Sequence, residues 1–299
     1  MAAEQQAALR GELLHKESMA RHTSWRVGGP ADCYYRPADI EDLALFLQQL
    51  PVDEPLTWLG LGSNLLVRDG GIRGTVISTS GLLNEISLQE GNLIRAEAGV
   101  SCAKLARFAA REGLAGAEFF AGIPGTVGGA LAMNAGAFGG ETWPLVVRVE
   151  TIDRQGQRYM RTPSDYAIAY RSVKGPDDEW FVAAQLQLEK GDVEAGQASI
   201  KELLAKRGAT QPTKQPSCGS VFRNPEGDHA ARLIEQCGLK GKCIGKACVS
   251  EKHANFIVNT GDATAKDIES LIEEVAETVK RECAVSLTHE VHIIGESEK

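Results

Sequence analysis

The stretch Ala121-Gly122-Ile123-Pro124-Gly125-Thr126-Val127-Gly128-Gly129 decides how this chain folds. It overlaps the segment Gly122–Gly140, in which seven of 19 residues are glycine. Glycine lacks a Cβ, so its backbone can approach a ligand closely and adopt positive φ, but it loses more entropy on folding than any other residue. So much glycine in one short stretch therefore favours a ligand-binding loop over a simple turn.

A second glycine loop, Gly60-Leu61-Gly62-Ser63-Asn64, directly follows the apolar run Leu56–Leu59. Successive backbone N–H groups in such turns form a concavity that binds anions, and a pyrophosphate is the natural guest. Ser63, Asn64 and Thr126 would add side-chain donors. Taken alone, this loop fits a tight turn between packed elements equally well, because Gly and Asn dominate turns generally.

Neither loop follows the common nucleotide-binding patterns. A G-x-G-x-x-G starting at Gly60 would need glycine at position 65, which is leucine. The pairs Gly241-Lys242 and Gly245-Lys246 are not followed by Ser or Thr, so there is no P-loop. The loops therefore point away from both the Rossmann and the P-loop folds.

Composition and charge exclude several classes of protein. The chain has 299 residues, 43% hydrophobic and 24% charged, which is ordinary for a soluble globular protein. A net charge of -8 argues against a nucleic-acid partner bound by a basic surface, although a local basic pocket for a phosphorylated small molecule is compatible with it. The chain lacks an apolar run of the ~18 residues that span a membrane, and Met1–Gln6 is too polar for a signal peptide.

The seven cysteines are odd in number and scattered, which predicts reduced thiols in the cytoplasm and no disulfide framework. Cys237, Cys243, Cys248 and His253 lie close together in sequence, but their spacing is a weak match to a zinc site. Free cysteine is among the most buried residue types, so buried thiols are favoured here and no metal is expected.

Local patterns predict helices and strands along most of the chain. Helices are expected after the caps Asp39, Ser101 and Thr264, and over 198–207 and 229–237. Strands are expected at 32–36, 56–59, 67–69, 74–78, 93–97, 146–153, 181–188, 254–258 and 286–294. The turn Asp69-Gly70-Gly71 should join two of them, and the first 20 residues should be a loose lead-in with one helical stretch.

Together with four further motifs, the glycine loops resemble those of the UDP-N-acetylenolpyruvoylglucosamine reductase family. The further motifs are Thr23-Ser24-Trp25-Arg26-Val27-Gly28-Gly29-Pro30-Ala31-Asp32, Tyr170-Arg171, Ser217-Cys218-Gly219-Ser220-Val221-Phe222-Arg223-Asn224-Pro225 and Glu290-Val291. The match covers roughly residues 20–294 in the family's order. Each motif is weak alone, but the ordered combination is highly specific.

The resemblance implies an α+β fold with a two-lobed FAD-binding domain of the vanillyl-alcohol oxidase (PCMH) type and a C-terminal α+β substrate-binding domain. The implied bounds are a lead-in at 1–20, FAD-binding lobes at about 21–80 and 81–195, and a substrate-binding domain at 196–299 whose final strand completes the active site. It also implies that NADPH reduces the FAD and leaves, after which UDP-N-acetylglucosamine enolpyruvate enters and is reduced to UDP-N-acetylmuramate for peptidoglycan.

The resemblance also assigns roles to residues. Arg171 would grip the substrate carboxylate as enolate charge develops, and Ser220 would donate a proton to C2. Glu290 would assist them as an acid or as an oriented carboxylate. The FAD contacts would come from Gly60, Leu61, Gly62, Ser63, Asn64, Gly122, Ile123, Pro124, Gly125, Thr126, Val127, Gly128 and Gly129. Substrate contacts would come from Tyr170, Arg223 and Asn224, with Lys206, Arg207 and Lys214 as further candidates for the diphosphate.

From the residues alone, each catalytic assignment has an ordinary alternative. Arg171 would be a surface arginine after a buried tyrosine. Ser220 would be a polar turn residue, and it lacks the G-x-S-x-G setting of a hydrolase nucleophile because position 222 is phenylalanine. The alternation of apolar residues over 286–294 points Glu290 away from the core, as on a solvated edge strand.

The chain departs from the family's pattern in two details, of which the first places it in the shorter class. Only 48 residues separate Arg171 from Ser220, which leaves no room for an insertion whose tyrosine closes over the substrate. Cys218 stands where alanine is common, so a bulky thiol reagent should block activity.

Two other functions stay open on the sequence: an FAD-dependent oxidase of the same fold, and a nucleotide-sugar binding protein without activity. Reoxidation by the enolpyruvyl sugar, against slow reoxidation by oxygen, would separate a reductase from an oxidase. The expected partners are the UDP-sugar and NADPH, without nucleic acid or membrane insertion. The oligomeric state is open, with a monomer favoured.

Overall fold

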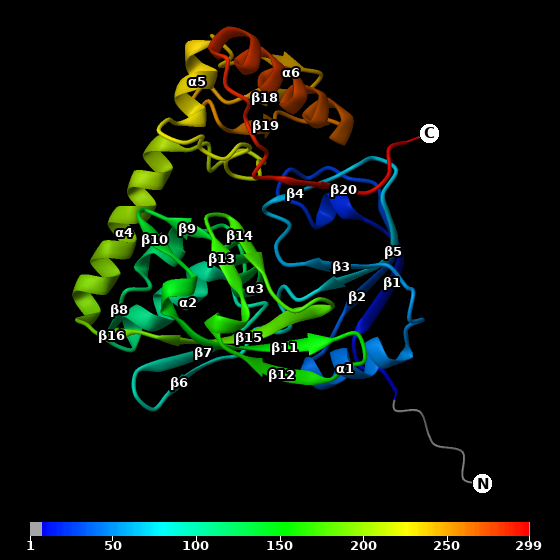
Figure 1. Ribbon diagram of the computed structural model, residues 1–299, viewed down its shortest axis with the longest axis vertical. Helices are drawn as coiled ribbons and strands as arrows, with labels where there is room; N and C mark the ends of the chain where they lie inside the picture. Colours follow the sequence, from blue (N-terminus) through cyan, green and yellow to red (C-terminus); the bar gives the residue numbers. More distant parts are fainter. Residues whose placement is uncertain (1–7, 299) are drawn as a thin grey trace. The chain divides into compact units, whose positions relative to one another are not determined.

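The computed structural model describes residues 8–298 and divides into two compact units, each described here by itself (Figure 1). The first unit contains residues up to Leu14, Cys33–Gly60 and Gly74–Leu203, and the second contains His15–Asp32, Leu61–Arg73 and the chain from Leu204 onward. Two short N-terminal segments therefore pack with the C-terminal part of the chain. The family-based domain bounds given above stay predictions, because the units follow contacts rather than family boundaries.

The first unit is built around a five-stranded antiparallel sheet in the order β12-β11-β15-β7-β6. Its strands are β12 (Arg158–Arg161), β11 (Val146–Asp153), β15 (Glu179–Gln187), β7 (Leu93–Glu97) and β6 (Ile86–Gln89). The predictions for β7 and β11 match to the residue. Helices α2 (Cys102–Arg111) and α3 (Val127–Met133) lie near this sheet in Figure 1, and Ser101 caps α2 as expected by accepting from Lys104 N.

A four-stranded sheet has the order β1-β2-β5-β3. Its strands are β1 (Glu12–Ser18), β2 (Pro30–Arg36), β5 (Ile72–Ser78) and β3 (Leu56–Leu59), and β3 is parallel to β5. Helix α1 (Ile40–Gln49) begins at the predicted cap Asp39, and the Phe46 ring stacks on Tyr35 at 3.6 Å between centroids. Apolar side chains on α1 thereby cover the buried ends of β2 and β5 within the first unit.

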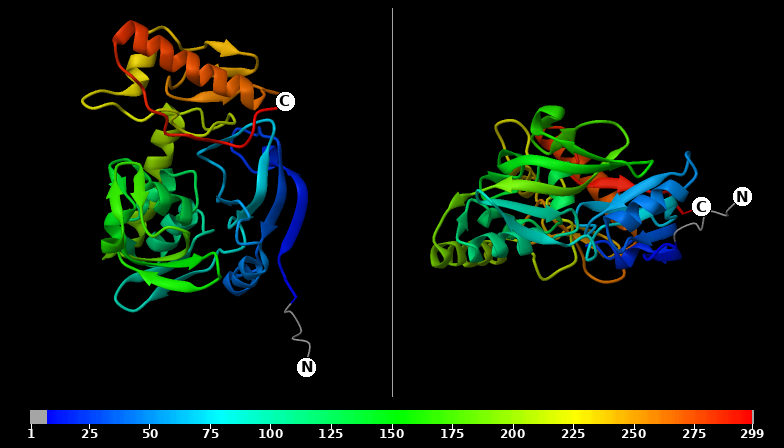
Figure 2. Two further views of the ribbon diagram at one scale, coloured as in Figure 1. Left: turned by 45° about the vertical axis from the view of Figure 1, so that its right-hand side comes forward. Right: turned by 90° about the horizontal axis from the view of Figure 1, so that it is seen from below.

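Helices α5 (Ala230–Gln236) and α6 (Ala265–Cys283) lie side by side in the second unit (Figures 1 and 2). They share an apolar core with the sheet β17 (Cys243–Ile244), β18 (Ala247–Val249) and β19 (Ile257–Asn259). Thr264 and Asp267 form the predicted capping box of α6, and the carboxylate of Asp69 accepts from two further backbone N–H groups of its first turn. Strand β4 (Leu65–Val67) pairs in parallel with β20 (His292–Ile294).

The remaining elements are short or connect these layers. Strand β13 (Ala167–Ala169) and β14 (Ser172–Lys174) form a hairpin, and α4 is a long helix at Val193–Thr210. Paired short strands are β8 (Leu114–Ala115) with β16 (Glu189–Lys190), and β9 (Gly136–Ala137) with β10 (Gly140–Glu141). Single-turn 3-10 helices cover Met19–Arg21, Glu118–Gly122, Trp143–Leu145 and Pro163–Asp165.

Several expectations for elements are wrong. Residues 12–18 of the expected loose lead-in form β1, whose side chains are mostly exposed, so the burial pattern that identifies a strand is missing. Strands β4 and β5 do not form a hairpin around Asp69-Gly70-Gly71, because each pairs in a different sheet. The last strand is only His292–Ile294, helix α4 is longer than 198–207, and β19 lies later than 254–258. Residues 1–7 of the lead-in lie outside the described residues.

The expectation of seven reduced thiols is also wrong. Cys243 and Cys248 face each other across β17 and β18 and form a disulfide, with their Cα atoms 4.1 Å apart. Cys33, Cys102, Cys218, Cys237 and Cys283 are free thiols. The sequence pattern missed the disulfide because it depends on a tight hairpin turn between the two cysteines, at Gly245-Lys246.

A buried carboxylate in the first unit makes stability depend on pH. Arg95 donates to both oxygens of Glu150, at 2.6 and 2.8 Å, and these bonds hold the pKa of Glu150 below its ordinary value. A carboxyl whose pKa is lowered in the folded state stabilises the fold at pH values above its unfolded pKa of about 4.3. This contribution is lost as the pH falls through the folded pKa. Glu150→Gln should therefore lower the free energy of unfolding by about 2 kcal/mol at pH 7 and by much less near pH 3. Urea titrations at several pH values measure this difference.

Glu12→Gln is the matched control, because Glu12 contacts Arg36 on the surface and a pair so exposed contributes little. A Glu150→Gln deficit that stays constant from pH 7 to pH 3 would contradict the assignment.

Candidate active site

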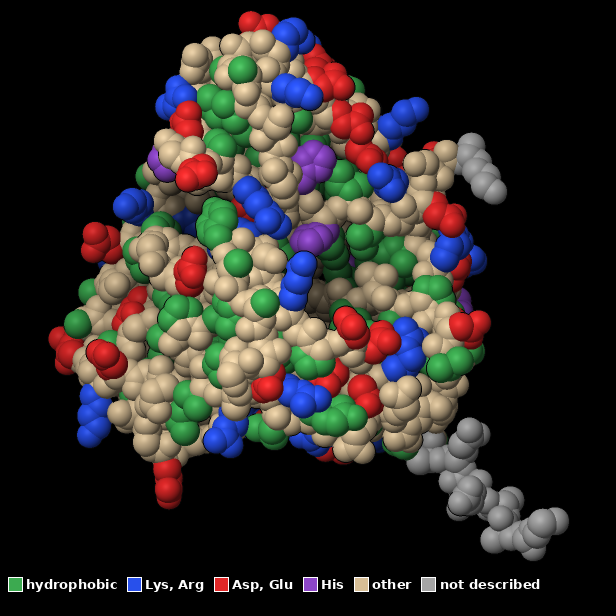
Figure 3. All heavy atoms as spheres, viewed as in Figure 1, with side chains coloured by type: hydrophobic (Ala, Val, Ile, Leu, Met, Phe, Trp, Pro, Cys, Tyr) green, Lys and Arg blue, Asp and Glu red, His purple; other side chains and the backbone are tan. Residues whose placement is uncertain are grey.

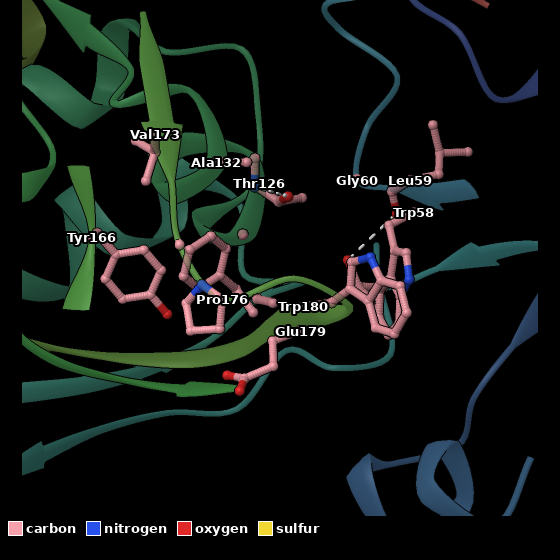
Figure 4. A pocket seen from close by; sticks show the side chains of 16 residues that line it. Trp58, Leu59, Gly60, Thr126, Ala132, Tyr166, Val173, Pro176, Glu179 and Trp180 are labelled. Atoms are coloured by element: carbon pink, nitrogen blue, oxygen red, sulfur yellow. Dashed lines mark hydrogen bonds between the residues drawn. The ribbon is translucent and has the colours of Figure 1, made fainter. Parts of the chain in front are cut away.

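A cavity of about 320 Å³ opens within the first unit, inside the usual range of small-ligand sites. Its wall includes Trp58 and Gly60 at the end of β3, Thr126 at the start of α3, and Tyr166, Glu179 and Trp180 near β13 and β15. Figure 4 shows Tyr166 and Pro176 on one side, and Trp58 and Gly60 on the other. The cavity thus joins parts of both predicted glycine loops to aromatic residues distant in sequence.

The two glycine loops meet because their residues have no side chain at the contact. A Cβ on Gly60 would lie 2.5 Å from Thr126 Oγ1, so any larger residue would force the loops apart. A Cβ on Gly128 would lie 2.9 Å from the Cβ of Ala98, at the point where Gly128 N donates to Ala98 O. Close approach is therefore the reason for glycine at these two positions.

Only part of the predicted cofactor set lines this cavity. Gly60, Thr126, Gly128 and Gly129 do so. Gly122 instead packs against Phe138, and the Val127 side chain is buried. The remaining predicted residues of the second loop, Ile123, Pro124 and Gly125, are not part of its wall, and Leu61, Gly62, Ser63 and Asn64 belong to the second unit.

The cavity wall carries two buried polar atoms that fit a bound ligand. Trp58 Nε1 and Tyr166 Oη are shielded from solvent and have no hydrogen-bonding partner among residues 8–298. Since a buried donor without a partner costs about 1–3 kcal/mol, such atoms at a cavity wall suit a ligand that accepts from them. The residues present therefore fit a nucleotide cofactor. Sequence analysis missed both side chains; the only available signal was the position of Trp58 two residues before Gly60.

In the second unit, the first glycine loop is tied to the segment that contains Glu290. Asn64 Nδ2 donates to Glu290 O at 3.0 Å, and His292 N donates to Asn64 O at 3.0 Å. Asn64, expected to bind a cofactor, thus also fixes the backbone on both sides of Val291. Glu290 lies in an irregular segment rather than on the predicted regular strand.

Ser220 sits on a short segment held from two sides in the second unit. Val221 N donates to Asn255 O at 2.9 Å, while Glu290 N donates to Val221 O at 2.8 Å. Val221 and Phe222 are buried, and Ser220 beside them is half-buried. The structure therefore brings Ser220 and Glu290 onto neighbouring segments. The Asn255 side chain also accepts a hydrogen bond from Phe222 N and donates one to Phe222 O. Asn255 is therefore a supporting residue that sequence analysis missed.

Glycine is needed at position 219 for its backbone conformation and not for lack of space beside Ser220. Its φ is 72°, in the region that favours glycine, and a Cβ there would meet nothing within 4 Å. The residue before Ser220 is therefore glycine because of its left-handed conformation.

The Cys218 thiol is a packing group. It is 3% exposed, and its sulfur lies 3.4 Å from Leu65 O and 3.7 Å from Gly62 O. Burial raises the pKa of this thiol to about 12. The expected sensitivity of Cys218 to a bulky reagent is therefore wrong for the folded protein, because neither a thiolate nor access is available.

Arg171 lies at the turn of the β13–β14 hairpin in the first unit. Its guanidinium donates to Asn134 O at 3.3 Å and to Gly136 O at 3.1 Å, and it lies 5.2 Å from the ring of the exposed Tyr170. Its φ is 53°, a conformation that is uncommon for a residue with a side chain. Asn134, itself at positive φ after α3, links this turn to Ala169 and Trp143 and is another residue that sequence analysis missed.

The other candidates for substrate binding differ in their surroundings. Asn224 Oδ1 accepts from Ala230 N and so caps α5, which leaves its amide N–H₂ as the group for a ligand. Arg223 is half-buried, and its backbone N donates to Thr288 O. Lys206 and Lys214 are exposed, while Arg207 contacts Gln211.

The described residues form neither a membrane-spanning helix nor a cluster of metal-binding side chains, and the face in Figure 3 carries mixed charge. Across residues 8–298, each helix falls short of the length and apolar character that a bilayer crossing requires. In that same range, His, Cys, Asp and Glu side chains do not gather in threes as a metal ion needs. Figure 3 shows acidic and basic side chains interspersed over the face in view.

Comparisons with known proteins agree on one family. Residues 211–294 match the family described as UDP-N-acetylenolpyruvoylglucosamine reductase, C-terminal domain, and residues 31–159 match the family described as FAD binding domain. UDP-N-acetylenolpyruvoylglucosamine reductases from Alkalilimnicola ehrlichii and Nitrosococcus oceani are 64% and 61% identical, over 96% and 97% of both chains. The crystal structure of UDP-N-acetylenolpyruvylglucosamine reductase from Thermus caldophilus is similar with a TM-score of 0.82, at 34% identity over 95% of this chain and 98% of that one. The predicted α+β class is confirmed.

The burial of Cys218 predicts an inert thiol. With a pKa of about 12, on the order of one Cys218 in 10⁴ would be ionised at pH 8. In native protein treated with N-ethylmaleimide, Cys33 should react while Cys218 stays unmodified, and both should react in urea. Peptide mass spectrometry reads the sites, and Cys218 reacting as fast as Cys33 in the native state would refute its burial.

Proposed function

The chain belongs to the UDP-N-acetylenolpyruvoylglucosamine reductase family, and on that premise we propose which of its residues hold the cofactor and substrate and which carry the reaction. It is a flavin-dependent oxidoreductase that uses NADPH and FAD to reduce UDP-N-acetylglucosamine enolpyruvate to UDP-N-acetylmuramate in peptidoglycan synthesis. The observation that carries this function is 64% identity over 96% of both chains, together with the FAD-binding family at 31–159.

Residues of the two glycine loops are proposed to hold FAD. Gly60, Thr126, Gly128 and Gly129 line the cavity, where the absence of a side chain on the three glycines lets a ligand approach the backbone closely. The other loop residues named above are proposed contacts on the strength of the family pattern. Bound FAD supplies the hydride for the substrate double bond, after NADPH has reduced it.

Arg171 is proposed to bind the substrate carboxylate. A guanidinium can engage a carboxylate through two parallel hydrogen bonds and can stabilise the negative charge that spreads onto it when the adjacent C2 becomes enolate-like. Two carbonyl oxygens orient the Arg171 side chain, and its positive φ is the kind of backbone strain that clusters at functional sites. Tyr170, Arg223 and Asn224 are proposed substrate contacts.

Ser220 is proposed to donate the proton that C2 needs. An alcohol is a weak acid, but an enolate carbon is a strong base, so a rigidly placed hydroxyl can transfer its proton. Val221 N donates to Asn255 O, and Val221 O accepts from Glu290 N. These two hydrogen bonds next to Ser220 give it that rigid support. Glu290, on the neighbouring segment, is proposed to share a proton or a hydrogen bond with the serine oxygen as negative charge forms on it.

We also propose the wider setting of the enzyme. The FAD-binding part is proposed to cover 21–195 and the substrate-binding part 196–299. A monomer is favoured, as it is from the sequence. A cytoplasmic location is proposed, because five of the seven cysteines are free thiols, including Cys237 and Cys283 with sulfurs 3.6 Å apart. A reducing compartment keeps such thiols unbonded.

Ser220→Ala separates the two half-reactions. Reduction of the flavin by NADPH should stay within about twofold of wild type, because the serine takes no part in it. Reoxidation by the enolpyruvyl sugar should fall by roughly 10²–10⁴-fold, the usual contribution of a positioned proton donor. Stopped-flow absorbance of the flavin measures both rates.

Ser87→Ala, an exposed serine on β6, is the matched control and should change neither rate. Equal loss of both half-reactions in Ser220→Ala would mean that the serine is structural. Fast reoxidation by oxygen in wild type, with none by the sugar, would favour the oxidase instead.

A further inference from the structure

We propose that His253 is a positioning residue for the proton-transfer step: its unprotonated Nδ1 holds Asn255, and Asn255 holds the segment that carries Ser220. The proposal deepens the function above, since it rests on Ser220 as the proton donor. The contacts that support it all lie within the second unit. It assigns a role to a histidine outside the family motifs quoted above.

Asn255 is 3% exposed and forms hydrogen bonds through all four of its polar groups. Three of these groups bond the two residues that follow the serine. Asn255 O accepts from Val221 N at 2.9 Å, Oδ1 accepts from Phe222 N at 3.0 Å, and Nδ2 donates to Phe222 O at 2.8 Å. The fourth group, the backbone N–H, donates to Nδ1 of His253 at 3.3 Å. His253 is therefore the one anchor of Asn255 in these bonds that lies outside the serine segment.

The serine segment is bonded on its other side to the glutamate segment. Glu290 N donates to Val221 O at 2.8 Å, so the backbone of Val221 is bonded to Asn255 through its N–H and to Glu290 through its carbonyl. A shift of Asn255 would move the backbone directly after Ser220. Since a misplacement of about 1 Å can cost 10²-fold in rate, the position of Asn255 bears on proton transfer.

His253 is itself fixed by the loop between β18 and β19. Phe256 N donates to His253 O at 3.0 Å, and Ser250 N donates to Phe256 O at 2.8 Å. The imidazole of His253 packs against the edge of the Phe256 ring, with centroids 4.8 Å apart and planes at 66°. These contacts hold the ring with its Nδ1 directed at the N–H of Asn255.

The bond to Asn255 requires a neutral histidine. Both ring nitrogens of an imidazolium carry protons, so Nδ1 accepts only in the neutral ring, with the remaining proton on Nε2. Burial holds the pKa of His253 below its ordinary value of 6.5, and the positive charge of Lys240 acts in the same direction. Glu235, on α5 and paired with Lys240 at 2.7 Å, acts in the opposite direction. The accepting form therefore prevails at pH 7 and is lost as the pH falls below 6.5 through the folded pKa.

Two substitutions separate the acceptor from the imidazole ring. In His253→Asn the side-chain oxygen can accept from the N–H two residues later, as asparagine does in turns, and this oxygen takes up no proton. In His253→Gln the longer side chain carries its oxygen beyond that N–H. Reoxidation of the flavin by the enolpyruvyl sugar at pH 7.5 should stay within about threefold of wild type in His253→Asn and fall by about tenfold in His253→Gln. Reduction by NADPH should stay within about twofold in both, and stopped-flow absorbance measures both rates.

The pH profile is a readout that a merely structural role would not change. Below pH 6.5 the wild type loses its acceptor, whereas His253→Asn keeps it. The ratio of the wild-type reoxidation rate to that of His253→Asn should therefore fall by at least about threefold from pH 7.5 to the lowest pH at which both proteins stay folded. Titration of other groups, Glu290 included, affects both proteins alike and cancels in this ratio.

His15→Gln is the matched control, because His15 is exposed on β1, and it should change neither rate. Equal slowing of reoxidation in His253→Asn and His253→Gln, loss of both half-reactions in His253→Gln, or a rate ratio that is constant with pH would overturn the proposal. If His253→Gln does not fold, the pH dependence of the ratio decides alone. Wild-type reoxidation in Ser220→Ala would instead refute the proposed role of the serine, and wild-type protein whose flavin NADPH does not bleach would refute the function itself.

Discussion

The hydrogen bonding of one buried tryptophan determines how the second unit is assembled. Trp25 is fully buried, and its indole N–H donates to Ile257 O at 2.7 Å, 232 residues later in the chain. Asn259 Nδ2 returns a bond to Trp25 O at 3.0 Å. A buried polar group must be hydrogen-bonded, so these two hydrogen bonds fix the segment around Trp25 against β19. The first glycine loop then packs on that segment, since Ser24 N donates to Gly62 O.

The hydrogen bonds of Trp25 and the packing of the first glycine loop also position the segments of Ser220 and Glu290 in the second unit. The carbonyls of Gly62 and Leu65 lie against the Cys218 thiol, and Asn64 holds the backbone of Glu290. Loop, serine segment and glutamate segment are thus connected by hydrogen bonds to backbone carbonyl groups. Preorganisation of this kind is what the proposed role of Ser220 requires, because a weak acid transfers its proton more readily when no reorganisation is needed at that moment.

Local signals in the sequence predicted the helices well and the long-range features poorly. Helices α1, α2 and α6 start at the predicted residues because each has a cap that acts within three residues, at Asp39, Ser101 and Thr264. Strand β1 was missed because its exposed edge position removes the alternation of apolar residues. The cavity wall and the hydrogen bonds of Asn255 to Phe222 join residues more than thirty positions apart, and no local pattern encodes such contacts. The motifs for Arg171, Ser220 and Glu290 were recognised through the family, and the residues alone favoured ordinary roles for them.

The two glycines of the first glycine loop are needed for different physical reasons. Gly60 ends the first unit, where the missing side chain lets it lie against Thr126 at the cavity. Gly62, two residues later in the second unit, has φ of 59° and packs on the backbone of His22 and Thr23. The first glycine therefore serves close approach at the wall of the cavity, and the second serves a left-handed turn that directs Asn64 to Glu290. Alanine at position 60 would therefore displace Thr126 at the cavity wall, whereas alanine at position 62 would act on the position of the glutamate segment.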